Sequence, residues 1–308
     1  MLAKIIVIGS SNTDMVVKAA HLPGPGETIL GGTFLMNPGG KGANQAMAAQ
    51  RLQSNQGQVA FVAKVGTDIF GQQAIQGFEQ AGMDTRFVLK DESSPSGVAL
   101  IGVDERGENS IMVAPGANAN LTAAEVSRAL SEIPNAEWVL LQLEIPLDTV
   151  ENSIAECAKK GMKVVLNPAP AQKLSDDIFK NLYLITPNET EAELLTGVAI
   201  TDTNTARKAA GILREKGVEN IVITLGAKGA FVYNSTTDLL ILSPIVEAVD
   251  TTAAGDVFSG ALVVALSEGK SLADGITFAC QAAALSVTRM GAQSSIPSRG
   301  EVEALLKG

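Results

Sequence analysis

Short apolar runs rich in β-branched residues alternate with amphipathic segments along most of the chain. Strand-like runs occupy residues 5–8, 59–65, 138–143, 163–166, 183–185 and 220–225. Between them, apolar residues recur at helical spacing in 43–52, 71–81, 123–133, 147–160 and 206–216. The part from Ala254 onward predicts helices only. This alternation predicts an α/β fold with a doubly wound, mostly parallel central sheet and helices on both faces.

Two segments interrupt the alternation. Residues 14–36 carry short β-like runs broken by Pro and Gly, and residues 97–113 have the pattern of a hairpin around the polar turn 104–108. Both could be surface excursions, or they could meet as a small β-sheet that forms a lid over a site. We expect the lid, on a single α/β domain that spans residues 1–308.

Composition excludes several classes of protein. The 308 residues include 23 Lys and Arg against 33 Asp and Glu, a net charge of −10, which argues against nucleic-acid binding. The one histidine, His21, rules out a multi-histidine zinc site and lies in a Pro/Gly-rich stretch that suits a catalytic triad poorly. Cys157 and Cys280 are too few for a disulfide framework and fit a reducing cytoplasm. No run of 18 apolar residues predicts a membrane span.

The strongest local signal is the segment 250–256, Asp-Thr-Thr-Ala-Ala-Gly-Asp, which directly precedes an apolar helical run. Small residues at a helix start leave backbone N–H groups free to bind an anion. Asp256 could be an ordinary first-turn acid, or it could take a proton from an attacking hydroxyl while the N–H groups hold a phosphoryl group. Its place at a helix N-terminus predicts a lowered pKa and a weak base, which a late proton transfer tolerates.

Three glycines and two amides mark a second segment, 37–46, which reads Asn-Pro-Gly-Gly-Lys-Gly-Ala-Asn-Gln-Ala. It lacks the spacing of a Walker A loop. Asn12 and Asp14 follow the first strand at the edge where doubly wound sheets bind ligands, although that turn lacks the dinucleotide fingerprint. Each segment could be a polar turn or a ligand-binding loop.

Three further turns are open to two interpretations each. Asn188 and Glu191 could cap a helix or lie around a magnesium–phosphate complex. Residues 224–229 could be a tight hairpin or a nucleotide-phosphate turn. Residues 286–297 could end a helix at Gly291 or offer carbonyls to a monovalent cation.

Taken together, these segments resemble the PfkB family of carbohydrate kinases. The resemblance extends from residue 5 to about 297; residues 39–46 are similar to the first signature of the family and residues 250–256 to the second. It implies ATP-dependent phosphorylation of D-ribose to D-ribose 5-phosphate. The alternatives are a kinase of the same family for 2-deoxyribose, a ketose or adenosine, and a sugar-binding sensor without catalysis.

The resemblance also implies roles for individual residues. Asp256 would be the base, and Ala253, Ala254 and Gly255 would form the anion hole with its backbone. Ribose would be bound by Asn12, Asp14, Gly40, Lys41, Asn44, Glu144 and Asp256. ATP would contact Asn188, Thr224, Leu225, Gly226, Ala227, Lys228, Gly229, Gly255 and Cys280, the last standing where relatives often have Asn or His. Glu191 would orient Mg²⁺ through water, and K⁺ would be surrounded by Asp250, Thr252, Ser286, Arg289, Gly291 and Ser295. The lid would form a homodimer.

Overall fold

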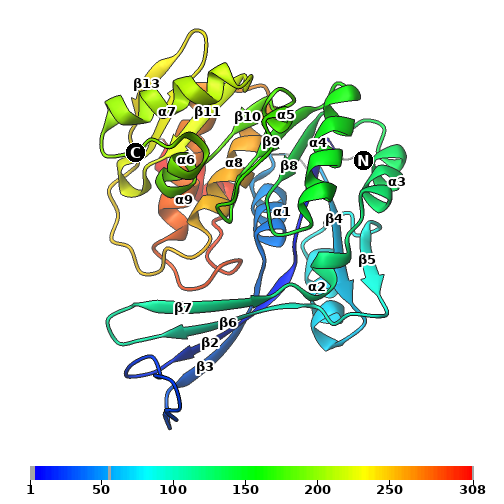
Figure 1. The fold of residues 1–308 in the computed structure, drawn as a ribbon, viewed down its shortest axis with the longest axis vertical. Coiled ribbons are helices and arrows are strands. Elements are labelled where there is room, and N and C mark those ends of the chain that lie inside the picture. The colour runs from blue at the N-terminus through cyan, green and yellow to red at the C-terminus, as the bar shows by residue number, and fades with distance from the viewer. Residues whose placement is uncertain (1–3, 55–56, 307–308) are drawn as a thin grey trace.

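The computed structural model describes residues 4–54 and 57–306, and a nine-stranded sheet runs through its centre (Figure 1). The strand order is β13-β12-β11-β10-β9-β8-β1-β4-β5. The pairs are parallel from β11 to β5 in this order, whereas β12 and β13 pair antiparallel. The strands are β1 Ile5–Ile8, β4 Val59–Gly66, β5 Val88–Asp91, β8 Trp138–Leu141, β9 Lys163–Leu166, β10 Leu184–Ile185, β11 Asn220–Thr224, β12 Ala230–Tyr233 and β13 Asp238–Ile241.

Helices cover both faces of this sheet. They are α1 Lys41–Leu52, α2 Ile69–Gln80, α3 Ala123–Glu132, α4 Leu147–Lys159, α5 Asp176–Phe179, α6 Glu189–Thr196, α7 Thr203–Glu215, α8 Ala254–Ser267, α9 Leu272–Ser286 and α10 Arg299–Leu305. Successive strand residues point to opposite faces, so Ile5 and Val7 of β1 join the core under α1, α2, α8, α9 and α10, and Ile6 and Ile8 join the core under α3 to α7. The two buried faces explain why the strands are apolar without alternation.

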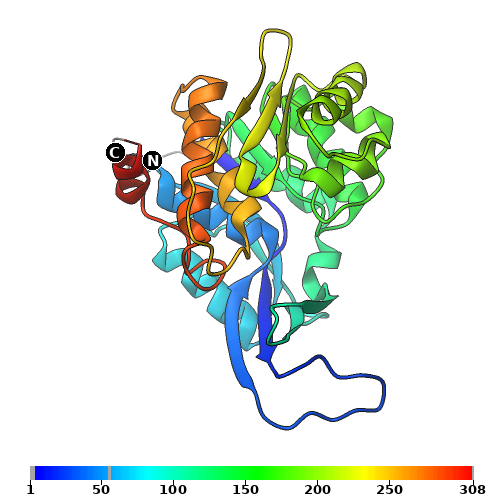
Figure 2. The same cartoon turned by 90° about the vertical axis from the view of Figure 1, so that its left-hand side faces the viewer.

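A second sheet of four strands, which we call the small sheet, projects from one end of the body (Figures 1 and 2). Its order is β3-β2-β6-β7, with β2 Asn12–Lys18, β3 Thr33–Gly39, β6 Gly97–Val103 and β7 Asn109–Ala114. Apolar side chains are exposed on it, among them Phe34 at 60% and Met112 at 67%. This much exposed apolar surface on edge strands is unusual for a surface that remains in water.

The predicted architecture is confirmed. The central sheet is doubly wound and mostly parallel, the two interrupting segments do meet in one small sheet, and the chain after Ala253 is helical. The strand expected over 138–143 ends at Leu141, and β5, β12 and β13 were not predicted. Among the described residues, no helix is long and apolar enough to cross a membrane.

Candidate active site

The site lies where the strand order reverses. Strand β1 pairs with β4 on one side and with β8 on the other, so the loops that follow β1 and β8 diverge and leave a crevice at the carboxyl ends of the strands. Ser10 and Asn12 follow β1, and Gln142 and Glu144 follow β8. Ser10 Oγ donates to Glu144 Oε2 at 2.6 Å, which joins the two loops across the crevice.

Glycines allow α1 to begin directly above the end of β1. Gly40 has φ of 87°, a left-handed conformation that favours glycine, and turns the chain into the helix. A Cβ on Gly42 would lie 2.5 Å from the backbone nitrogen of Ser10, so only glycine permits this contact. The first residue of the helix, Lys41, is thereby held at the crevice, where its backbone N–H donates to Glu144 Oε2 at 3.0 Å.

Another glycine brings α8 against α1. A Cβ on Gly260 would lie 2.7 Å from the carbonyl oxygen of Gln45, so the two helices cross at close range because this position has no side chain. One turn earlier on α8, Asp256 meets the side-chain amides of α1. Asn44 Nδ2 donates to Asp256 Oδ2 at 3.0 Å, and Gln45 Nε2 donates to Asp256 Oδ1 at 2.9 Å. The carboxylate is buried and held at both oxygens.

Acidic side chains surround one lysine at this crevice. Burial lowers the pKa of Lys41, but the charges of Asp256, Glu144, Glu191 and Asp14 outweigh it and raise the pKa overall. Burial, with the charges of Glu144 and Asp256, raises the pKa of Asp14 to about 6. The sequence places these residues far apart, yet the fold gathers them around one cation.

The predicted lowering of the Asp256 pKa is wrong. Burial raises the pKa of this carboxyl above its usual value, although Lys41 and the hydrogen bonds from Asn44 and Gln45 act in the opposite direction. The helix N-terminus favours the charged form, but removal of the carboxylate from water outweighs it. Asp256 is therefore a better base than its position on the helix suggests.

The segment before α8 has a strained backbone. Ala253 is the only non-glycine among the described residues with positive φ, 61°, a conformation that costs on the order of 1 kcal/mol. The first i→i−4 bond of the helix runs from Val257 N to the Ala253 carbonyl, and Ala254 N donates to Thr251 at 3.3 Å. The N–H groups of Gly255 and Asp256 precede that first helical bond, so they are available to an anion.

The expected nucleotide residues lie at the carboxyl ends of β10 and β11. Asn188 and Glu191 form a reciprocal capping box at the start of α6, so the capping interpretation is confirmed. Residues 224–229 form the expected hairpin, with a short 3-10 helix Gly226–Lys228 at its turn. The Thr224 N–H donates to Pro187 at 2.9 Å, which brings the hairpin beside Asn188. Cys280 lies on α9, 4% exposed, and burial raises the pKa of its thiol to about 11.

The residues expected around a monovalent cation are partly brought together. The Asp250 carboxylate accepts from Thr252 N at 2.9 Å and from Gly291 N at 2.8 Å, which joins residues 250–252 to the loop after α9. The hydroxyls of Ser286 and Ser295 donate to carbonyls of their own turns. The guanidinium of Arg289 pairs with Glu301 instead. Within residues 4–54 and 57–306, no group of three or more His, Cys, Asp or Glu is arranged to hold a metal ion.

Sequence reasoning missed a shell of buried amides behind the site. Asn118 donates to Asn12 Oδ1 at 2.8 Å and accepts from Ser11 N, which fixes the start of β2. Gln142 and Asn167 both contact Gln45, whose motif was noticed without a role for its side chain. Polar residues at the ends of two buried strands were the available signal, but their partners are distant in the chain.

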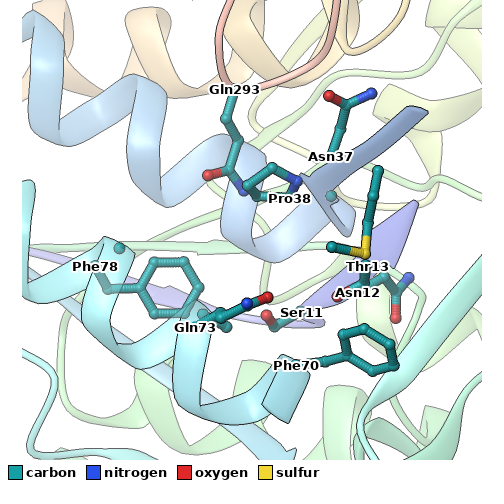
Figure 3. Close-up of a pocket in the computed structure, with 13 residues that line it drawn as sticks. Ser11, Asn12, Thr13, Asn37, Pro38, Phe70, Gln73, Phe78 and Gln293 are labelled. Atoms are coloured by element: carbon teal, nitrogen blue, oxygen red, sulfur yellow. The ribbon is translucent and has the colours of Figure 1, made fainter. Parts of the chain in front are cut away.

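A cavity of about 130 Å³ lies behind the small sheet, between β2, β3 and α2 (Figure 3). Gln293 reaches in from one side, with Phe70, Gln73 and Phe78 on the other. Thr13 lines this cavity, and since Thr13 and Asp14 are successive strand residues, their side chains leave opposite faces of β2. None of the thirteen lining residues is charged, and Asn12, one of the expected sugar residues, is among them.

The chain belongs to the pfkB family of carbohydrate kinases, whose model matches residues 2–299. It is 46% identical to a ribokinase of Haemophilus influenzae over 297 residues, 96% of each chain. It is 38% identical to a deoxyribokinase of Salmonella typhi, over 96% of this chain and 95% of that one. The crystal structure of an Arabidopsis thaliana ribokinase complexed with ribose and ATP superposes with a TM-score of 0.93 at 32% identity, covering all of both chains.

Proposed function

We propose that the protein transfers the terminal phosphoryl group of ATP to D-ribose, giving D-ribose 5-phosphate and ADP. The observation that carries the proposal is Asp256, a buried carboxylate of raised pKa held at both oxygens by Asn44 and Gln45. It lies within the field of Lys41 and of the carboxylates that suit a polyol, Asp14 and Glu144. The ribokinases among its relatives support ribose as the acceptor.

In this mechanism Asp256 accepts the proton of the primary hydroxyl as phosphoryl transfer proceeds. Its raised pKa makes it a stronger base than an aspartate in water. The N–H groups of Gly255 and Asp256 stabilise charge on the transferred group, together with the positive end of α8. Ala253, in its left-handed conformation, and Ala254 set the direction of these N–H groups.

The sugar is held by hydrogen bonds from and to the crevice. Asp14 and Glu144 accept from hydroxyls, and charged acceptors make the stronger bonds. Asn44 Oδ1 is buried and has no hydrogen-bond partner among the described residues, which fits an acceptor for a sugar hydroxyl. Asn12, Gly40 and Lys41 complete the proposed sugar contacts. A site of this kind discriminates strongly against an analogue that lacks the hydroxyl it binds.

For the nucleotide, we propose contacts from Asn188, Gly255, Cys280 and the hairpin 224–229. Mg²⁺ fits this site only as a partner of the phosphates, because no three-ligand cluster is present among the described residues and Mg²⁺ keeps much of its water. Glu191, buried at the start of α6, would orient the ion through water, and the ion would neutralise part of the phosphate charge.

K⁺ fits the second ion site, where Asp250 and Gly291 meet. The carboxylate of Asp250 would supply the charge, and the backbone of Thr252, Ser286, Arg289, Gly291 and Ser295 would supply carbonyls. Bound there, the ion would stabilise the turn that orients the start of α8. The junction of Asp250 with Gly291 supports the proposal, since it joins the two segments that carry these carbonyls.

The small sheet would serve as a lid over the sugar and as the surface of a homodimer. Its edge strand β7 is exposed at every residue, including Ile111, Met112 and Val113. A second copy of the chain would cover this apolar surface and its unpaired strand edge. The free buried thiols of Cys157 and Cys280 fit a cytoplasmic protein.

The test is ADP release by the purified protein with ATP, Mg²⁺ and K⁺, using ribose, 2-deoxyribose, fructose and adenosine as acceptors. We expect turnover on ribose to exceed that on every other acceptor. Turnover confined to 2-deoxyribose would refute ribose as the substrate but would leave Asp256 as the proposed base. This alternative is tested because one relative of the chain is a deoxyribokinase. Binding of ribose without turnover of any acceptor would indicate a sugar-binding sensor without catalytic activity.

A further inference from the structure

We propose that Gln45, fixed in one orientation by Gln142 and Asn167, is a positioning residue that aims the Asp256 carboxylate at the acceptor hydroxyl. The proposal rests on the proposed function in that Asp256 acts as the base. Gln45 itself is 0% exposed and lies behind the carboxylate, so it does not touch substrate. Its role would be exerted through Asp256 alone.

Both ends of the Gln45 amide are occupied. Its Nε2 donates to Asp256 Oδ1 at 2.9 Å and to Asn167 Oδ1 at 3.0 Å, and its Oε1 accepts from Gln142 Nε2 at 2.5 Å. An amide turned by 180° would place its oxygen against the oxygens of Asp256 and Asn167 and its NH₂ group against the NH₂ group of Gln142. The surroundings therefore select one orientation, the one in which Gln45 donates to the carboxylate.

Asn167 is itself fixed by the backbone. Its Nδ2 donates to the Thr186 carbonyl at 3.1 Å, and a carbonyl can only accept, so Asn167 Oδ1 must face Gln45. This constraint reaches Gln45 from the ends of β9 and β10, whereas the constraint from Gln142 comes from the end of β8. The ends of β9 and β10 thus set the orientation of Gln45, and Gln142 supplies the donor from which the Gln45 oxygen accepts.

The Gln142 side chain lies against Gly9, directly after the first strand. A Cβ on Gly9 would lie 2.0 Å from Gln142 Oε1, so the glycine that ends the first strand leaves room for this amide. Gln142 is 0% exposed, and its Oε1 has no hydrogen-bond partner among the described residues. A buried amide that is only half satisfied opposes folding, whereas an apolar side chain of similar size would not. Its retention next to the base fits a role in catalysis better than a role in stability.

The carboxylate held in this way has a fixed plane. Asn44 and Gln45 each anchor one oxygen of Asp256, and rotation about the Cβ–Cγ bond would break both hydrogen bonds. Other charged groups that influence Asp256 are Lys41, Glu144, Glu191 and Asp14, whereas its side-chain hydrogen bonds come from Asn44 and Gln45. A base must meet its proton at hydrogen-bond distance, so loss of a fixed plane lowers the rate of transfer more than the affinity for sugar.

The decisive experiment compares Gln45→Met, Gln142→Met and the double variant with wild type by steady-state kinetics. Gln45→Met preserves length and removes both hydrogen-bonding groups. We expect kcat to fall roughly 10- to 100-fold, as for a displaced catalytic group, with KM for sugar and ATP within about threefold of wild type. Gln142→Met should lower kcat by about three- to tenfold in the wild-type background and should cause no further loss in the Gln45→Met background, because it acts through Gln45.

Gln50→Met is the matched control, since it removes an amide from the same helix. Gln50 bonds to the backbone of Gly57 and Val59, away from the crevice, and should leave kcat unchanged. A folded Gln45→Met protein with kcat within twofold of wild type would overturn the proposal. So would additive losses in the double variant, or KM values that rise as much as kcat falls.

The proposed function and this inference fail in different ways. The kinetics use whichever acceptor the wild type converts fastest. If ribose is not that acceptor, the assay uses another sugar, and the ratio of the variant kcat to the wild-type kcat still tests the positioning role. If the wild type converts none, the proposed function is refuted, and crystal structures of wild type and Gln45→Met then decide. We expect the Asp256 carboxylate to be turned out of its bond with Asn44 in the variant; an unchanged carboxylate would refute the positioning role.

Discussion

Replacement of Asp14 by asparagine should stabilise the ligand-free protein at neutral pH while it weakens sugar binding. Burial, together with the charges of Glu144 and Asp256, raises the pKa of Asp14 to about 6 from its ordinary value of 3.8. The folded protein therefore holds this proton more tightly than the unfolded chain does. As the pH rises from about 4 to above 6, the unfolded chain loses the proton first, and the free energy of unfolding decreases.

The size of the effect follows from that difference. At 1.36 kcal/mol per pKa unit, the ionised Asp14 side chain lowers the free energy of unfolding by about 3 kcal/mol above pH 6. With an unfolding entropy of about 2.1 cal/mol/K per residue, this corresponds to a Tm shift of about 5 °C for the whole chain. Asparagine has nearly the same shape and does not ionise, so Asp14→Asn should recover most of that stability at pH 7.5 and little at pH 4.5.

The assay is thermal or urea unfolding of both proteins at pH 4.5 and 7.5 without ligand. Asp91→Asn is the control for the loss of one negative charge from an acidic chain. Hydrogen bonds from the side chains of Ser93 and Asn120 hold the pKa of Asp91 far below its usual value, so this variant should lose stability at pH 7.5. An Asp14→Asn protein that gains the same stability at both pH values, or none, would refute the reasoning. In the wild type, KM for ribose should rise as the pH falls below about 6, because protonated Asp14 accepts more weakly.

Three further predictions concern catalysis, the cation and assembly. Asp256→Asn should lower kcat by roughly 10²–10⁴-fold in a protein that still folds, and normal turnover by the folded variant would exclude Asp256 as base. Exchange of K⁺ for Li⁺ should reduce ADP release by the wild type, whereas Asp250→Asn should be slow and respond little to the exchange; equal rates of wild type in both salts would exclude the cation role. Met112→Lys should halve the mass measured by analytical ultracentrifugation. Leu239 is an exposed apolar residue on β13, and Leu239→Lys should leave the mass unchanged. Equal masses for both variants would place the interface elsewhere.

Much of the fold could be predicted because its strands are short, β-branched and buried on both faces. Ile5–Ile8 and Lys163–Leu166 were placed to the residue for this reason. The strand expected to end at residue 143 ends at Leu141, where the paired strands β1 and β9 also end, at Ile8 and Leu166. Strand β13 was missed because it is exposed or only partly buried along its length. Strand β12 is buried at its first three residues, but only one of its four residues, Val232, is β-branched.

The residues of the candidate site could be predicted better than their pKa shifts and hydrogen-bond partners. The positions of Asp256, Lys41 and Asn44 could be inferred from their motifs. The pKa direction of Asp256 could not, because it depends on burial by segments more than 200 residues away. Gln142 and Asn167 escaped for a similar reason, since their partner Gln45 lies 97 and 122 residues from them along the chain.

The meeting of α1 with α8 has a consequence for how the protein is made. Gln45 and Asp256 are separated by 211 residues. The close contact of α1 with α8 at Gly260 can therefore form only after both helices have been synthesised. During synthesis, β1 cannot pair with β8, nor α1 pack against α8, until these later elements have been made. A nascent chain shorter than about 260 residues therefore contains the loops that bind the sugar but lacks a bound and oriented Asp256. Contacts of such long range form late and slowly. The acidic crevice thus remains catalytically inert until the segment that carries Asp256 and Gly260 has left the ribosome.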